Sequence, residues 1–230
     1  MNFSQWLRQL NAGKLISLLV SAAAALLCIT VHEAAHAWTA NRMGDPTARE
    51  RGRLSLNPLH HIDPLGLVCM IACGFGWARP VPIDPRRFRR PKLGMGLTAL
   101  AGPVSNVLLA IVLFLLNSVT RFIFAYSGYK MGWAYVSNFL LVCGGLSAGL
   151  AVFNLFPIPP LDGSKVFFLV LPEKAYWGLM RYERYGMLVL MLLLFLGVLD
   201  GPLQALQSGL VPGLLWATDW PFQVLSRLLA

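Results

Sequence analysis

Two histidines and a glutamate close a long apolar run near the start of the chain, in the stretch CITVHEAAHAW of residues 28–38. Residues four apart share one face of an α-helix, so His32 and His36 direct their imidazoles at one point, with Glu33 beside them. This arrangement suits zinc, which in catalytic sites takes three protein ligands and keeps one position for water. Glu33 is placed to act as the general base. The expected chemistry is hydrolysis of a peptide bond with one Zn²⁺ per chain.

The HExxH pattern is short, so its chance occurrence has to be weighed. With four His and four Glu among 230 residues, a shuffled chain would contain it roughly once in a thousand trials. An ionisable cluster within an apolar helix also costs several kcal/mol and usually marks function. The cluster is therefore interpreted as a metal site.

A third ligand has to come from elsewhere in the chain. His60 and His61 lie in a polar loop, where most histidines are solvated or cap a turn. Asp162 lies in NLFPIPPLDG, where prolines and Gly163 unwind the backbone after an apolar run. An aspartate before glycine is also an ordinary turn residue. Beside an incomplete two-histidine site, we expect Asp162 to be the third ligand.

The composition indicates an all-α integral membrane protein. Hydrophobic residues make up 57% and charged residues 13% of the chain, and the mean hydropathy is +0.62, against about 25% charged residues in soluble domains. At roughly 20 residues per span, the sequence predicts one polytopic domain over 1–230, a helical bundle of about four to six transmembrane helices. We expect the first helix to be retained and not cleaved as a signal peptide.

The basic residues predict the orientation of this bundle. The net charge of +9 is concentrated in short loops between apolar runs, which favours the positive-inside rule over a nucleic-acid partner. Both basic loops, 42–92 and 165–184, are expected in the cytoplasm, with the N-terminus outside. Because the helix rises 1.5 Å per residue, His36 should lie roughly 10 Å inside the cytoplasmic edge marked by Arg42.

The individual segments are predicted from the apolar runs. Residues 65–84 hold an apolar piece too short to cross, with basic loops on both sides, which predicts a re-entrant, β-like segment beside a cavity. The four cysteines lie in apolar segments and are interpreted as packing residues: Cys28, Cys69, Cys73 and Cys143. The predicted elements are spans at about 14–38, 93–118 and 133–156, a short helix near 163–171, an apolar run over 176–199 and a proline-interrupted tail.

Several motifs together resemble a known family. HEAAH, AGPVSN and NLFPIPPLDG, in this order, are similar to motifs of the site-2 protease family of intramembrane zinc metalloproteases. LNPLHHIDPLG and GWARPVPID resemble its compact bacterial branch. The resemblance covers about residues 13–170, whereas the C-terminal helices at about 173–230 carry no family motif. It implies a bacterial plasma (inner) membrane enzyme, and we expect no regulatory domain within the chain.

The resemblance also implies roles for single residues. His32 and His36 would be zinc ligands with Asp162, and Glu33 would be the base. Asn106 would stabilise the oxyanion, or else form an interhelical hydrogen bond. By the same resemblance, Asn154 and Pro160 would contact the substrate. Independently of it, a transmembrane substrate must unwind to be cut, and we expect the re-entrant segment to pair with it as a strand edge, through Trp77, Ala78, Arg79, Pro80 and Val81.

The expected function is hydrolysis of peptide bonds in or near transmembrane segments, in regulated intramembrane proteolysis or in clearance of membrane peptides. The partners would be a transmembrane protein or peptide substrate and the lipid bilayer. Two alternatives stay open. A catalytically silent zinc scaffold is disfavoured because structural zinc sites usually close all four positions. A metal transporter is disfavoured because the sequence offers no second site along a path.

Overall fold

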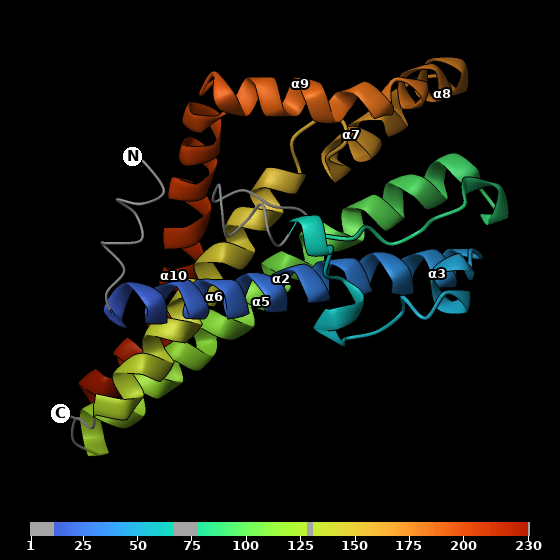
Figure 1. The fold of residues 1–230 in the computed structure, drawn as a ribbon. Coiled ribbons are helices and arrows are strands. Elements are labelled where there is room, and N and C mark those ends of the chain that lie inside the picture. The colour runs from blue at the N-terminus through green and yellow to red at the C-terminus, as the bar shows by residue number, and fades with distance from the viewer. Residues whose placement is uncertain (1–11, 67–77, 128–130, 230) are drawn as a thin grey trace.

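The computed structural model describes residues 12–66, 78–127 and 131–229, and its long elements are helices (Figure 1). Among these residues, three helices are long and apolar enough to cross a membrane: α2 (Ala12–Met43), α5 (Pro91–Ser127) and α6 (Met131–Asn154). Helices α9 (Glu183–Phe195) and α10 (Asp200–Leu229) pass the same test only as a pair bent by 84°. The chain is therefore an integral membrane protein. Its described residues provide three candidate spans, or four if the bent pair is one span, against the four to six predicted from its length.

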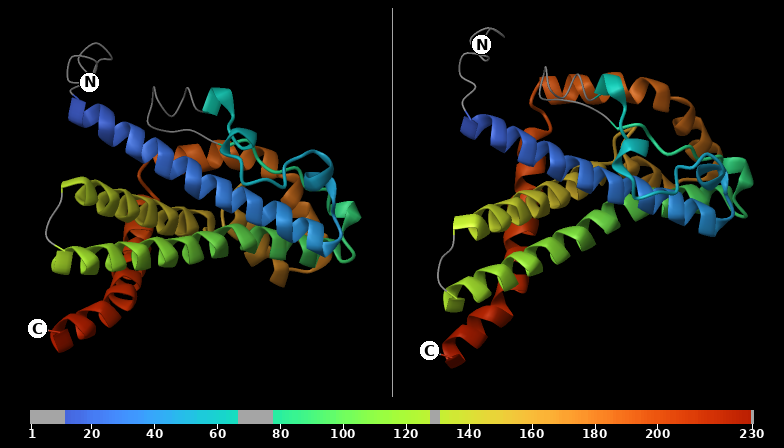
Figure 2. Two further views of the ribbon diagram at one scale, coloured as in Figure 1. Left: turned by 90° about the horizontal axis from the view of Figure 1, so that it is seen from below. Right: turned by 60° about the horizontal axis from the view of Figure 1, so that its bottom comes forward.

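Small residues let the long helices approach closely. Ala24 of α2, Leu113 of α5 and Cys143 of α6 form one buried cluster. A second cluster joins Ala110 and Ala148, and α10 packs apolar side chains onto it. Lipid provides no hydrophobic drive between helices, so such close van der Waals packing holds membrane bundles together. Figure 2 shows α2, α5 and α6 running alongside one another, with α10 crossing them.

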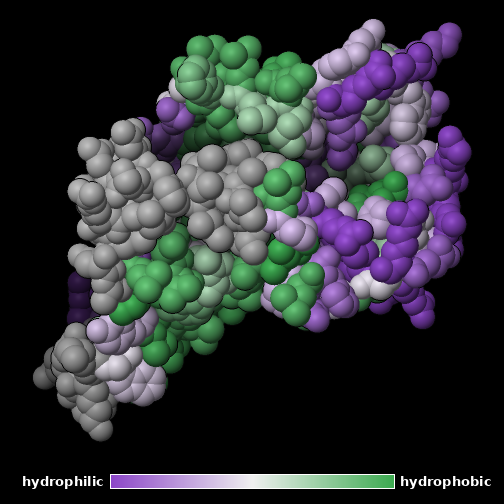
Figure 3. All heavy atoms as spheres, viewed as in Figure 1, coloured by the Kyte–Doolittle hydropathy of each residue, from purple (hydrophilic) through white to green (hydrophobic). Residues whose placement is uncertain are grey.

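The short elements gather at one end of this bundle, where α2 ends and α5 begins (Figure 1). On the face drawn in Figure 3, hydrophilic residues are concentrated at this end. Because it holds Arg42 in the last turn of α2 and the four arginines of residues 86–90 just before α5, we call it the basic end. Between α2 and α5 lie α3 (Thr47–Glu50), η1 (Pro58–His60) and η2 (Pro85–Arg87). After α6 come α7 (Asp162–Phe167), η3 (Phe168–Val170) and α8 (Glu173–Arg181).

The expected spans are present, and two of the three helices are longer than the apolar runs suggested. Helix α2 continues to Met43, and α5 to Ser127. The tail differs from the prediction, because α10 is one helix through Pro212 and Pro221. A proline removes one backbone hydrogen bond, and neighbouring groups in a membrane bundle can compensate for that loss.

The predicted re-entrant segment is described only in part, because residues 67–77 lie outside the described residues. Ala78 forms an isolated antiparallel bridge with Ile62, and residues 79–84 follow without helix or strand. Within the described ranges, β-like pairing is thus limited to this bridge. Cys28 and Cys143 are buried and unbridged, whereas Cys69 and Cys73 lie outside the described residues.

Candidate active site

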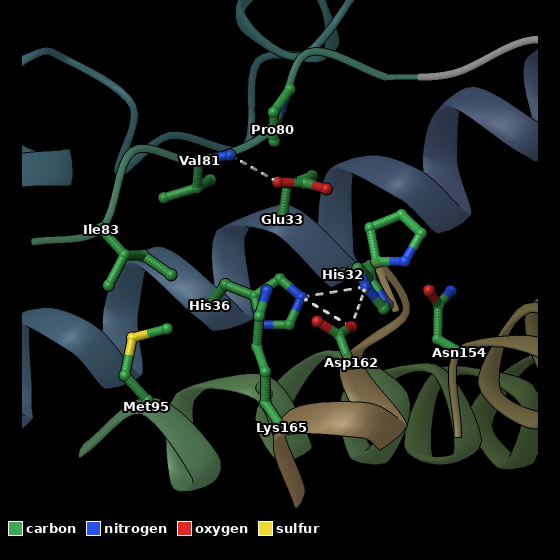
Figure 4. A pocket seen from close by; sticks show the side chains of 12 residues that line it. His32, Glu33, His36, Pro80, Val81, Ile83, Met95, Asn154, Asp162 and Lys165 are labelled. Atoms are coloured by element: carbon green, nitrogen blue, oxygen red, sulfur yellow. Dashed lines mark hydrogen bonds and ion pairs between the residues drawn. The ribbon is translucent and has the colours of Figure 1, made fainter. Parts of the chain in front are cut away.

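Three side chains from distant parts of the chain converge inside the bundle (Figure 4). The Nε2 atoms of His32 and His36 lie 3.0 Å apart. Each also lies 3.1 Å from Oδ2 of Asp162. The two histidines are 5% and 6% exposed, so this cluster of ionisable groups is withdrawn from solvent. The two histidines and the aspartate that we predicted as metal ligands are therefore brought together.

A break after α6 brings Asp162 to the histidines. Helix α6 ends at Asn154, and α7 begins at Asp162 after a proline-rich turn. A Cβ atom on Gly163 would lie 2.1 Å from the carbonyl oxygen of Leu155, so only glycine fits after this aspartate. Aspartate binds a metal ion as the carboxylate, which is also its ordinary form near neutral pH.

The other ring nitrogen of each histidine has its own partner. Nδ1 of His36 lies 2.7 Å from the backbone carbonyl of Thr98, to which it donates. Nδ1 of His32 lies 3.1 Å from Nδ2 of Asn106. The Asn106 Oδ1 atom is buried without a hydrogen-bond partner, and a half-turn of the amide places it where it accepts from Nδ1–H. With a metal ion bound, both imidazoles would carry their proton on Nδ1 and direct the Nε2 lone pairs at the ion.

This donor set fits a zinc ion. Zinc bonds to histidine nitrogen and carboxylate oxygen at about 2.0–2.1 Å, so tetrahedral ligand atoms lie about 3.3 Å apart. The three atoms here are separated by 3.0–3.1 Å. Among the described residues, the same three side chains form the one group of potential ligands close enough to hold a metal ion. Two neutral imidazoles and one carboxylate leave a fourth position open.

Gly102 of α5 backs the two imidazoles, and the sequence analysis did not single it out. A Cβ atom there would lie 2.5 Å from Cε1 of His32 and 2.5 Å from Cε1 and Nε2 of His36. Its neighbour in the AGPVSN motif, Asn106, is fully buried. Since Thr98 also contacts His36, one stretch of α5 forms the support behind both histidines.

Glu33 lies on the other side of the histidines, against the segment 78–84. Its Oε2 atom accepts a hydrogen bond of 2.9 Å from the backbone N–H of Val81. Buried groups of the loop that follows α2 hold this segment in place. The Arg53 guanidinium donates to the carbonyl oxygen of Arg79, and Asp45 accepts from the N–H of Asp84 at 2.7 Å. The segment is therefore fixed beside Glu33.

A cavity of about 190 Å³ opens onto these groups. Four of the residues predicted to contact a substrate line it: Pro80, Val81, Asn154 and Pro160. Ala78 and Arg79 are not part of its lining, and Trp77 lies outside the described residues. Asn106 is also absent from the lining, because its amide is turned towards His32.

Further residues that line the cavity were not predicted from the sequence. Lys165 lines the cavity. Because Lys165 follows Asp162 by three residues, the two lie on the same face of α7, and this spacing in the sequence could have predicted that Lys165 faces the site. Its ammonium group lies 3.1 Å from the Glu183 carboxylate. Met95 and Ile83 complete the apolar wall, and no motif marked them. His60 is exposed, whereas His61 is buried against the Ser55 carbonyl, and neither takes part in the cluster.

Comparisons with known proteins identify the family of this chain. The model of "Peptidase family M50" matches residues 116–198. "Putative zinc metalloprotease YwhC" of Bacillus subtilis (strain 168) is 39% identical over 171 residues, which cover 73% of this chain and 76% of that protein. "Putative zinc metalloprotease Rip2" of Mycolicibacterium smegmatis is 31% identical over 180 residues, covering 76% of this chain and 66% of the relative. No solved structure matches the chain.

The relative from Bacillus is similar over most of both chains, and the ligand cluster lies within a bundle of apolar helices. The chain therefore belongs to peptidase family M50, the site-2 protease family of membrane zinc metalloproteases.

Proposed function

We propose that this chain is an intramembrane zinc metalloprotease that hydrolyses peptide bonds in or near transmembrane segments of other proteins. One observation carries the proposal: two histidines and an aspartate meet within a bundle of membrane-spanning helices, and a glutamate outside this ligand group lines the same cavity. Three ligands with an open position favour catalysis over a structural zinc site. Within the described residues no second ligand group lies along a path, which disfavours transport.

The residues have distinct roles in this proposal. His32, His36 and Asp162 would hold the ion, which, when bound, supplies a Lewis acid that polarises a peptide carbonyl and acidifies water. Glu33 lines the same cavity without joining the ligand cluster, and would take the proton of the attacking water and pass it to the leaving amine. Asn106 would orient His32 through Nδ1, a role in which it does not touch the substrate.

Substrate binding would involve the segment 78–84. The hydrogen bonds that this segment already makes limit the ways in which a peptide could pair with it. From Arg79 to Val81 no backbone N–H is free: Arg79 donates to the His61 carbonyl at 2.9 Å, Pro80 has none, and Val81 donates to Glu33. An extended substrate that adds beside this segment would have to take over the Val81 N–H. Glu33 would then be released from Val81 when a peptide is present to be cleaved.

The bundle would lie in a bacterial plasma membrane with its basic end in the cytoplasm. Arg42 follows His36 by six residues in α2, and Lys92 precedes Thr98 by six residues in α5. Because the two helices are antiparallel, Arg42 and Lys92 both lie towards the basic end, about 9 Å along the helix axes from the level of the histidines. Short basic loops are kept on the cytoplasmic side, so the site would open towards the cytoplasm.

The test compares wild type with Glu33→Gln and Asp162→Ala, reconstituted in liposomes with a transmembrane substrate. Glu33→Gln should retain zinc and lose cleavage, whereas Asp162→Ala should lose zinc as well. Glu50→Gln is the matched control, because Glu50 is exposed at the protein surface. Cleavage by all four proteins at the same rate would refute the proposal. Metal flux into sealed vesicles without cleavage would indicate a transporter instead.

A further inference from the structure

A second cavity, of about 710 Å³, lies at the basic end between the start of α5 and the helix α8. It shares no lining residue with the active-site cavity. Lys92 of α5 donates to the backbone carbonyl of Leu171, and its ammonium lies 5.7 Å from the centre of the buried Tyr176 ring. These contacts fix α8 against α5, so the cavity has walls on two anchored elements.

The polar wall of this cavity is strongly basic. Arg89, Arg90 and Lys92 line it, against a single carboxylate, that of Glu173. Among the described ion pairs, none involves any of these four residues. Arg87 differs, since it pairs with Glu50 at 2.7 Å. The cavity therefore keeps an excess of positive charge, and guanidinium groups with free donors suit a phosphate group.

The opposite wall is apolar and lies where the apolar span of α5 begins. Leu93, Leu169 and Trp177 form it, and Trp177 is 37% exposed. Leu93 begins the exposed apolar surface of α5 directly after Lys92. Tryptophan is enriched where a membrane meets water, because its ring is apolar with one polar group. A ligand filling the whole cavity would thus be charged at one end and apolar at the other.

We propose that this cavity binds an anionic phospholipid, with the headgroup phosphate between the two arginines and the upper acyl chain against Leu93 and Trp177. A soluble anion would use the basic wall alone and leave the apolar wall exposed to water. The site is separate from the proposed peptide hydrolysis. A bound lipid would bridge α5 and α8 at the level of the headgroups.

The experiment measures fluorescence of the full-length protein in phosphatidylcholine vesicles that contain a rising fraction of brominated phosphatidylglycerol or brominated phosphatidylcholine. Bromine on the upper acyl chain quenches nearby tryptophan, and subtraction of the Trp177→Phe signal isolates this residue. We compare wild type with Arg89→Gln/Arg90→Gln. The matched control is Arg49→Gln/Arg51→Gln, which removes the same charge from exposed residues outside the cavity.

In wild type, phosphatidylglycerol should quench Trp177 at a much lower mole fraction than phosphatidylcholine. A basic residue near an anionic lipid contributes about 1 kcal/mol, or about fivefold. The Arg89/Arg90 variant should therefore bind phosphatidylglycerol about 30-fold more weakly and no longer distinguish the two lipids. The control should keep the preference, because salt at about 0.15 M screens charges that do not contact the lipid.

Two results would overturn the assignment. One is equal half-saturation of Trp177 quenching by both lipids in wild type, and the other is an equal loss of preference in the cavity variant and the control. Inorganic phosphate added at about 20 mM tests whether the cavity binds a lipid headgroup or a free phosphate ion. If it reverses the quenching completely, the site prefers a free phosphate and the lipid assignment is wrong. Because the readout is lipid binding, these outcomes do not depend on protease activity.

Discussion

Gly102 permits the sharpest test of the site, because a single methyl group should disable it. The substitution Gly102→Ala places a Cβ atom 2.5 Å from atoms of both His32 and His36, whereas ordinary contacts begin at 3.4 Å. Both imidazoles would have to retreat by about 1 Å. Metal–ligand distances tolerate about ±0.2 Å, and a misplacement of about 1 Å in an active site costs about 100-fold in rate. We therefore expect zinc affinity and kcat/KM each to fall at least about 100-fold.

The reason for this loss would be local and not a failure to fold. Within a helix, alanine is more favourable than glycine by about 1 kcal/mol, which opposes the cost of the clash. The control is Gly145→Ala in α6, where nothing lies within 4 Å of the added methyl group. Zinc affinity is measured by titration with a competing chelator, and cleavage with a reconstituted transmembrane substrate. A Gly102→Ala protein with wild-type zinc affinity and turnover would refute the close support of the histidines by α5.

Three further predictions concern groups around the site and in α8. Asn106→Leu removes the partner of His32 Nδ1 and should weaken zinc binding about 10- to 100-fold; a lowered kcat with unchanged zinc affinity would instead favour the oxyanion role. Asp45→Ala removes the acceptor of the buried Thr47 N–H and of the half-buried Asp84 N–H. It should lower the free energy of unfolding by about 2 kcal/mol, at about 1–3 kcal/mol per buried unpaired group, and an unchanged thermal midpoint in detergent would contradict this. Burial, with a smaller contribution from Glu183, raises the pKa of Tyr176 to about 12, so stability should be lost as pH rises from about 10 to about 12. Tyr176→Phe should abolish that loss and stabilise the protein by about 1 kcal/mol, because the hydroxyl is buried without a partner.

The ligand set was accessible from the sequence because its signals are local. Helical spacing pairs His32 with His36 whatever the rest of the fold does, and the prolines and Gly163 mark where the chain unwinds around Asp162. Hydrophobic runs likewise located α2, α5 and α6. In each case a few neighbouring residues determine the outcome.

The support of the site was not accessible in the same way. The contact of Gly102 with two imidazoles depends on how closely α5 approaches α2, and spacing along one helix contains no such information. The partner of Glu33 is a backbone N–H of Val81, which any residue except proline could provide. The role of Asn106 stays a prediction, since its burial against His32 favours orientation of the ligand but tests no chemistry. The continuity of α10 through two prolines depends on packing against α5 and α6, which a single segment does not reveal.

The distance along the chain between the ligands has a consequence for synthesis. His32 and Asp162 are 130 residues apart. At about 5–20 residues per second, roughly 6 to 26 seconds separate their emergence from the ribosome. Helix α2 would enter the bilayer with two histidines that have no third partner, and the centre could close only after α5 and α6 had followed. Under the proposed function, a newly made chain would therefore be unable to cut neighbouring membrane proteins until most of its own bundle was in place.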